Sequence, residues 1–72
     1  MKITVMYKND GKRAKLQYDA YAITAGTARQ ELGEDDCHGN GINPNAPIVT
    51  IHISGTERAT FDADHITILL DQ

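Results

Sequence analysis

The segment KITVMYKNDGKRAKLQY, residues 2–18, specifies the structure of the N-terminal part of the chain. Ile3, Val5 and Tyr7 alternate with Thr4, Met6 and Lys8, which is the period-two pattern of a strand with one buried face. The Asn-Asp-Gly segment at 9–11 is a strong turn signal, because Asn and Asp tolerate turn conformations and Gly supplies a positive φ. The alternation resumes after it, so residues 2–18 are predicted to form a β-hairpin.

The same alternation returns toward the C-terminus. Apolar residues alternate with polar ones over residues 49–53, and Gly55 then breaks the run. Two further apolar alternations follow, at residues 59–61 and 66–70. This pattern predicts a second β-hairpin followed by one more strand.

These two parts of the chain resemble each other. The segment YDAYAIT, residues 18–24, aligns with FDADHIT, residues 61–67, with four of seven positions identical and an aromatic residue first in both. Upstream, ITVMY at 3–7 aligns with VTIHI at 49–53. One interpretation is an internal duplication of a hairpin followed by an Asp-containing bend. The other is chance, since β-rich sequences reuse Thr, Ile and Asp.

The middle of the chain lacks alternation. Ala, Arg, Gln, Glu and Leu favour helix here, and a helix of about two turns is predicted within residues 24–36. Thr27 with Gln30 fits a capping box, Thr24 is an alternative N-cap, and Gly33 is placed to end the helix. The three acids after Gly33 would be unfavourable at the negative C-terminal end of the helix dipole, which supports this boundary.

Residues 33–47 are rich in Gly, Asn and Pro and are predicted to form a long loop. The whole chain, residues 1–72, is predicted to be one α+β domain. Its expected architecture is a small antiparallel sheet of four to five strands from two β-hairpins, with one short helix on the apolar face. An all-β small sheet or barrel is the alternative. The expected core comprises Ile3, Val5, Tyr7, Leu16, Tyr18, Ile23, Leu32, Val49, Ile51, Ile53, Phe61, Ile66, Ile68 and Leu70.

Charge is distributed unevenly along the chain, which has a net charge of −3. Residues 1–15 carry five Lys or Arg against one acid, whereas residues 16–72 carry two arginines against nine acids. Nucleic-acid binders usually carry a basic stripe over much of one face, so this balance disfavours nucleic acid as the general partner. No apolar run approaches the roughly 20 residues that span a bilayer, and no targeting signal is evident, so a cytoplasmic, non-membrane protein is expected.

The reactive side chains do not form a recognisable catalytic or metal-binding motif. Cys37 is the only cysteine, which excludes an intrachain disulfide and fits a reducing compartment. Cys37 and His38 are adjacent, and neighbours rarely both bind one metal, while His52 and His65 lie elsewhere. The acids before Cys37 disfavour a thiolate. No catalytic residues, metal or cofactor are therefore predicted, and the chain is expected not to be an enzyme; chemistry at Cys37 and His38 is the third-ranked alternative.

These observations favour a small acidic protein-interaction module that acts by surface binding without catalysis, of the kind that phages and mobile elements encode as inhibitors of host proteins. An acidic surface can occupy a basic groove through charge complementarity. The candidate residues for binding a protein partner are Glu31, Glu34, Asp35 and Asp36. The alternative is a nucleic-acid-binding accessory protein whose basic hairpin contributes Lys8, Lys12, Arg13 and Lys15. Self-association is a further way to stabilise so short a chain.

Overall fold

A computed structural model describes residues 1–71, except for the side chains of Asn9 and Asp71. The described residues form six strands, two short α-helices and one turn of 3₁₀-helix. In chain order these elements are β1 (Lys2–Asn9), β2 (Lys12–Asp19), β3 (Ala22–Thr27), α1 (Ala28–Leu32), α2 (Glu34–Gly39), β4 (Pro47–His52), β5 (Arg58–Asp62), η1 (Ala63–His65) and β6 (Ile66–Asp71).

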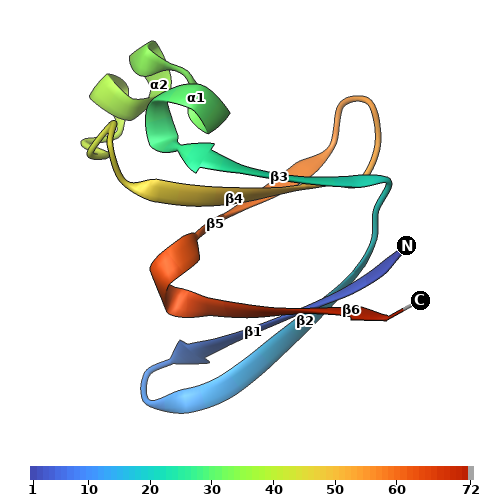
Figure 1. Cartoon of the computed structure of the whole chain (residues 1–72). Helices are drawn as coiled ribbons and strands as arrows, with labels where there is room; N and C mark the ends of the chain where they lie inside the picture. Colours follow the sequence, from blue (N-terminus) through green and yellow to red (C-terminus); the bar gives the residue numbers. More distant parts are fainter. Residues whose placement is uncertain (72) are drawn as a thin grey trace.

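The strands form two facing antiparallel sheets rather than one (Figure 1). Sheet A has the order β2-β1-β6 and sheet B the order β3-β4-β5. Each sheet is a hairpin joined by one strand from the other half of the chain, because β3 pairs with β4 and β6 pairs with β1. The predicted α+β class is confirmed, but the single sheet of four to five strands is wrong. Alternation reveals which face of a strand is buried and not which strand lies beside it.

Both predicted hairpins form, and they share a register. Asp10 and Gly11 link β1 to β2 with φ values of 52° and 78°, the paired positive angles of a tight hairpin turn. Ile3 lies opposite Tyr18 in the first hairpin, and Val49 lies opposite Phe61 in the second. These are the pairs that the sequence repeat equates. The rings of Tyr18 and Phe61 then meet edge to face, with centroids 6.2 Å apart.

The core lies between the two sheets. Ile3 and Val5 of β1 and Ile51 of β4 are fully buried, and partly buried residues from the other strands surround them. The prediction of a core position is wrong for two residues, because Leu16 is 38% exposed and Leu70 is 54% exposed. Both lie on outer strands of sheet A, where an inward-facing side chain has neighbours on one side only.

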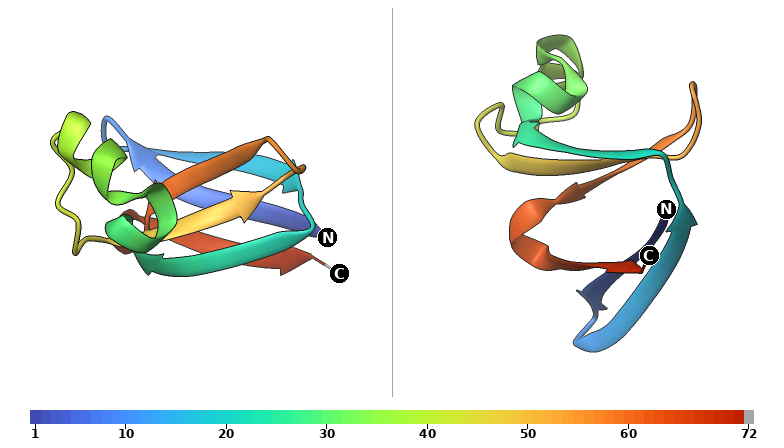
Figure 2. Two further views of the ribbon diagram at one scale, coloured as in Figure 1. Left: turned by 90° about the horizontal axis from the view of Figure 1, so that it is seen from above. Right: turned by 45° about the vertical axis from the view of Figure 1, so that its right-hand side comes forward.

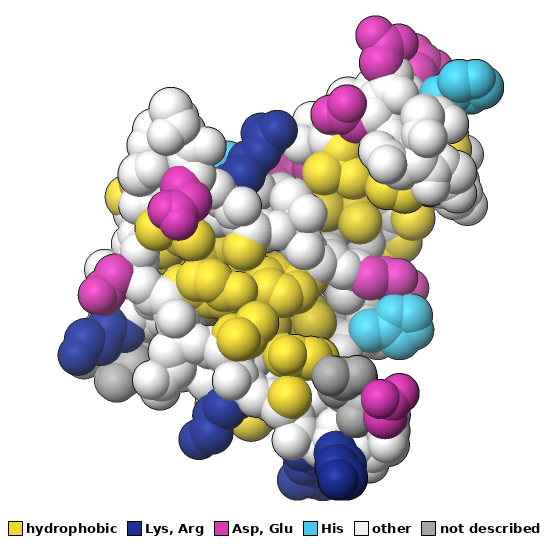
Figure 3. All heavy atoms as spheres, turned by 180° about the vertical axis from the view of Figure 1, so that it is seen from behind, with side chains coloured by type: hydrophobic (Ala, Val, Ile, Leu, Met, Phe, Trp, Pro, Cys, Tyr) yellow, Lys and Arg dark blue, Asp and Glu magenta, His cyan; other side chains and the backbone are white. Residues whose placement is uncertain are grey.

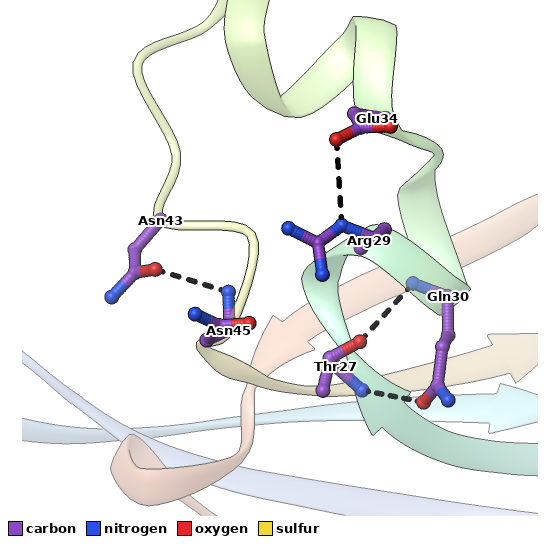
Figure 4. A network of polar contacts seen from close by, with 6 residues as sticks. All are labelled: Thr27, Arg29, Gln30, Glu34, Asn43 and Asn45. Carbon is purple, nitrogen blue, oxygen red and sulfur yellow. Dashed lines mark hydrogen bonds and ion pairs between the residues drawn. The ribbon is translucent and has the colours of Figure 1, made fainter.

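Helix α1 starts where the capping box predicts. The Thr27 hydroxyl accepts from the Gln30 backbone N–H, and the Gln30 side chain accepts from the Thr27 N–H (Figure 4). Gly33 ends the helix with φ of 92°. Residues 24–27, included in the predicted helical range, belong to β3 instead, because they pair with β4. The helix does not lie on the inner apolar face, which sheet A covers, but packs against the outer side of β3 and β4.

The predicted loop 33–47 is wrong over its first half, where residues 34–39 form α2. The three acids that follow Gly33 occupy the first turn of this second helix, where the positive end of the dipole favours them. Cys37 is consequently buried with Ala28 and Ile48 in a second, smaller apolar cluster. Neither α1 nor α2, nor any other helix within residues 1–71, is long and apolar enough to cross a bilayer.

Candidate functional site

A groove lies at the turn end of the first hairpin. Its volume is about 760 Å³, and strands β1, β2 and β6 line it together with η1. The apolar part of its lining comes from Met6, Tyr7, Ala14 and Ile66. The polar part comes from Lys8, Arg13, Lys15, Asp64, His65 and Thr67. The groove therefore combines apolar side chains with a predominance of positive charge.

The three groove cations occupy neighbouring positions on one face of sheet A. Lys8 lies directly opposite Arg13 across the hairpin, and Lys15 follows two residues along β2. All three side chains are exposed. Like charges placed opposite each other destabilise a strand pair. The two ion pairs found among the described residues involve Arg29 and His65, so neither neutralises these three cations.

Of the four basic residues predicted for nucleic-acid binding, three thus share the groove. The fourth, Lys12, begins β2 beside the turn and does not line it. Sequence alternation could place Lys8, Arg13 and Lys15 on one hairpin. It could not reveal that β6 and η1 complete a groove there, because those elements lie about 50 residues further along the chain.

The wall opposite the hairpin is organised by Asp62. Its Oδ1 accepts from the Asp64 backbone N–H at 3.1 Å, and its Oδ2 lies 3.1 Å from Nδ1 of His65. The bend-forming role predicted for this segment is confirmed at Asp62. Asp64 itself lines the groove, so this wall carries one carboxylate against the three cations of the hairpin.

The four candidate acidic residues do not act as one surface. Glu34 pairs with Arg29, with 3.6 Å between Oε1 and Nε (Figure 4). Asp35 and Asp36 are exposed on the first turn of α2. Glu31 turns instead toward sheet B, where it accepts a hydrogen bond from Thr24. Figure 3 shows magenta acidic side chains at the helical corner of the molecule, away from the basic side chains along the lower edge.

Thr24 is the centre of a polar cluster that sequence reasoning missed. Its hydroxyl donates to Glu31 Oε1 at 2.5 Å and lies 2.9 Å from Nε2 of His52. Because the single hydroxyl proton is directed to Glu31, Thr24 can only accept from an Nε2–H of His52. The ring of Tyr21 lies 5.9 Å from that of His52. The chain of bonds ties α1 to sheet B, so its geometry suits a structural clamp rather than nucleophilic chemistry.

Thr50 lies beside this cluster under α1. It sits between Thr24 and Thr60 on neighbouring strands, is 1% exposed, and its hydroxyl is the one buried side-chain polar atom without a hydrogen-bond partner in the part of the chain that is described. No groove opens onto it among those found. We therefore assign this threonine row to the packing of sheet B.

The residues considered for metal or thiol chemistry are dispersed. Cys37 is 2% exposed and points into the second apolar cluster, which corrects its expected place in a loop. His38 is exposed on the same helix. Residues 1–71 contain no group of three or more His, Cys, Asp or Glu side chains arranged to hold a metal ion. The burial of Cys37 also removes its sulfur from contact with a substrate in solution.

Comparison with protein-family models, curated proteins and solved structures finds no match to this chain.

Proposed function

We propose that this protein is a non-catalytic protein-binding module whose groove holds an acidic segment of a partner that also carries apolar side chains. The observation that carries the proposal is the unneutralised set Lys8, Arg13 and Lys15 beside an apolar groove lining. Placing Lys8 opposite Arg13 costs the hairpin stability, and an anionic ligand would offset that cost. The role as an inhibitor from a phage or mobile element stays a prediction from the sequence.

The apolar lining favours a polypeptide over a nucleic acid. Met6, exposed on the same face of sheet A as the three cations, offers contacts to aliphatic side chains, which a phosphate backbone does not possess. Proteins that bind single strands present exposed aromatic rings for stacking, whereas the one tyrosine in the groove, Tyr7, is half-buried, and the exposed ring of His65 is paired with Asp62.

The binding surface proposed here is the basic groove and not the predicted acidic set. Glu31 and Glu34 are already engaged with Thr24 and Arg29, so two of those four carboxylates have partners within the fold. The acidic helical corner can still contribute to orientation. Its charge is opposite to that of the groove, and such a dipolar distribution steers an approaching acidic partner toward the groove end.

Fluorescence anisotropy tests the proposal with three probes. The first is a short labelled peptide of alternating glutamate and leucine, the second replaces glutamate with glutamine, and the third is a single-stranded oligothymidylate. We expect the glutamate peptide to bind, the glutamine peptide to bind several-fold more weakly, and the oligonucleotide to bind more weakly than either at physiological salt.

Arg13→Gln and Lys2→Gln are matched variants for this experiment, since each removes one positive charge from an exposed position on the same face of sheet A. Arg13 lines the groove and Lys2 does not. Arg13→Gln should weaken the glutamate peptide several-fold and Lys2→Gln should leave it almost unchanged. Equal effects of both variants would refute a specific groove. Preferential binding of the oligonucleotide, with a steep loss of affinity as salt rises, would replace the protein-binding proposal with nucleic-acid binding.

A further inference from the structure

Strand β6 is an outer strand of sheet A with an exposed apolar end. It pairs with β1 along one side, and the strand order places no strand on its other side. Residues 66–70 contain no charged side chain. Leu69 is 49% exposed and Leu70 is 54% exposed. A neutral, apolar outer strand with unpaired backbone groups is a template for another strand.

The other three outer strands each carry a feature that discourages such pairing. The exposed face and turn end of β2 carry Lys12, Arg13 and Lys15. Strand β5 is short and has Arg58 and Asp62 at its two ends. Helix α1 folds back on β3, and the hydrogen bond from Thr24 to Glu31 fastens it there. Charged side chains and a packed helix are usual protections of a sheet edge, and residues 66–70 have neither.

We infer that β6 pairs in antiparallel fashion with β6 of a second copy of this chain, which joins two A sheets into one sheet of six strands. A two-fold axis makes the contact self-complementary, because each residue meets the same partner from both sides. The inference is independent of the function proposed for the groove.

The sequence of β6 selects the register of this pairing. Ile66, Ile68 and Leu70 share the inward face, so opposed residues must both be even-numbered or both be odd-numbered for the two cores to lie on the same side. The register with the longest overlap of residues 66–70 is centred on Ile68. It places Ile66 opposite Leu70 of the second copy, and Thr67 opposite Leu69. Every one of these pairs is uncharged, and the exposed Leu70 gains an apolar neighbour.

A second copy fits this edge better than an acidic or basic partner does, because residues 66–70 have no charge to recognise either. The charged alternative for self-association is a head-to-tail contact between the basic groove and the acidic helical corner of another copy. Such a contact does not close on itself and would build chains. Ile66 and Thr67 also line the groove, so pairing at β6 would extend that wall of the groove. The groove cations lie on β1 and β2 and stay outside the contact.

Sedimentation equilibrium over a wide concentration range tests the inference on the full chain. We expect a monomer–dimer equilibrium that changes little between low and high salt. Leu69→Lys, which places a charge on the exposed face of the edge, should raise the dimer dissociation constant about tenfold or more. Tyr21→Lys is the matched control, because Tyr21 is an exposed aromatic residue in the link between β2 and β3, outside every strand. It should leave the dissociation constant unchanged.

Thr67→Lys provides a second variant at an exposed position of β6 and should act like Leu69→Lys; circular dichroism verifies that both variants are folded. Hydrogen exchange locates the contact, since amides within residues 66–70 should exchange more slowly as concentration rises. A chain that stays monomeric at every concentration would overturn the inference. A dimer that both lysine variants leave intact, or one that dissociates as salt rises, would overturn it as well.

Discussion

Sheets A and B are built to the same plan, yet their outer faces differ. Each consists of one hairpin and one strand from the other half of the chain, and each gives its inner face to a shared core (Figure 2). The outer face of sheet B lies under α1 and α2 around Ile48. The outer face of sheet A carries the unneutralised cations of the first hairpin. A shared inner core thus leaves each outer face free to acquire its own role.

Truncation of core side chains in each sheet tests whether the two sheets share one core. Ile51→Ala in sheet B and Val5→Ala in sheet A each remove a side chain that is 0% exposed. Ile51→Ala should lower the free energy of unfolding by about 2–5 kcal/mol, and Val5→Ala by somewhat less because fewer carbons are lost. Urea unfolding followed by circular dichroism should show one transition for each variant, displaced to lower urea.

Leu16→Ala is the control for these core variants, since Leu16 is 38% exposed on an outer strand. Its cost should stay near 1 kcal/mol or below, because little buried area is lost. Two separate transitions in Val5→Ala or Ile51→Ala would contradict the shared core. They would mean that each sheet unfolds with its own hairpin.

The second effect concerns the cover that only sheet B possesses. Cys37→Ser places a hydroxyl in the apolar cluster that the buried thiol forms with Ala28 and Ile48. The expected cost is about 1–3 kcal/mol for the buried hydroxyl. Cys37→Ala, which removes the sulfur without adding a polar atom, should cost less. If serine and alanine were equally tolerated, the second cluster would not be a dry core.

Local patterns predicted the hairpins and the helix start because their causes are local. The Asn-Asp-Gly turn fixes two positive φ values at neighbouring residues, and the Thr27 and Gln30 side chains are one helical turn apart. Residues 24–27 of strand β3 were included in the predicted helical range because this segment, TAGT, has no apolar alternation of its own. Its strand structure comes from pairing with β4, whose position in the fold is set by contacts distant in sequence.

Helix α2 shows how the same evidence can support two structures. The acids after Gly33 correctly indicated that α1 ends there, since they oppose the dipole at a C-terminus. They also suit a new N-terminus, and burial of Cys37 decides in favour of the second helix. The groove was likewise only partly predictable from the sequence. Its cations belong to one hairpin and could be recognised in the sequence. Its far wall at Asp64 and His65 depends on the pairing of β6, from the C-terminal half of the chain, with β1.

A smaller loss of stability is expected when the N-cap of α1 is removed, because only the helices over sheet B are affected. Thr27→Ala removes the capping hydrogen bond of α1 and should cost about 1 kcal/mol. Labelling of the Cys37 thiol measures it directly, because the buried sulfur reacts only when the helices open. Labelling should accelerate several-fold in Thr27→Ala. Thr56→Ala, in the loop between β4 and β5, should leave the rate unchanged; equal acceleration in both variants would show that labelling reports global unfolding instead.

The smallest effect has the opposite sign and concerns the bare outer face of sheet A. Lys8→Gln removes one member of the like-charge pair with Arg13, so the hairpin should become more stable by about 0.2–1 kcal/mol, near the lower value for side chains in solvent. The same change should weaken the glutamate peptide in the groove. Added salt should shrink the stability gain, since it screens the repulsion that the substitution relieves. Lys2→Gln, at the other end of β1, removes a charge that lies opposite Asp19, so it should bring no gain in stability and no loss of binding. Replacing a residue that serves only the fold would lower the stability of the protein. A gain in stability combined with a loss of peptide binding in Lys8→Gln would therefore indicate a binding role for Lys8.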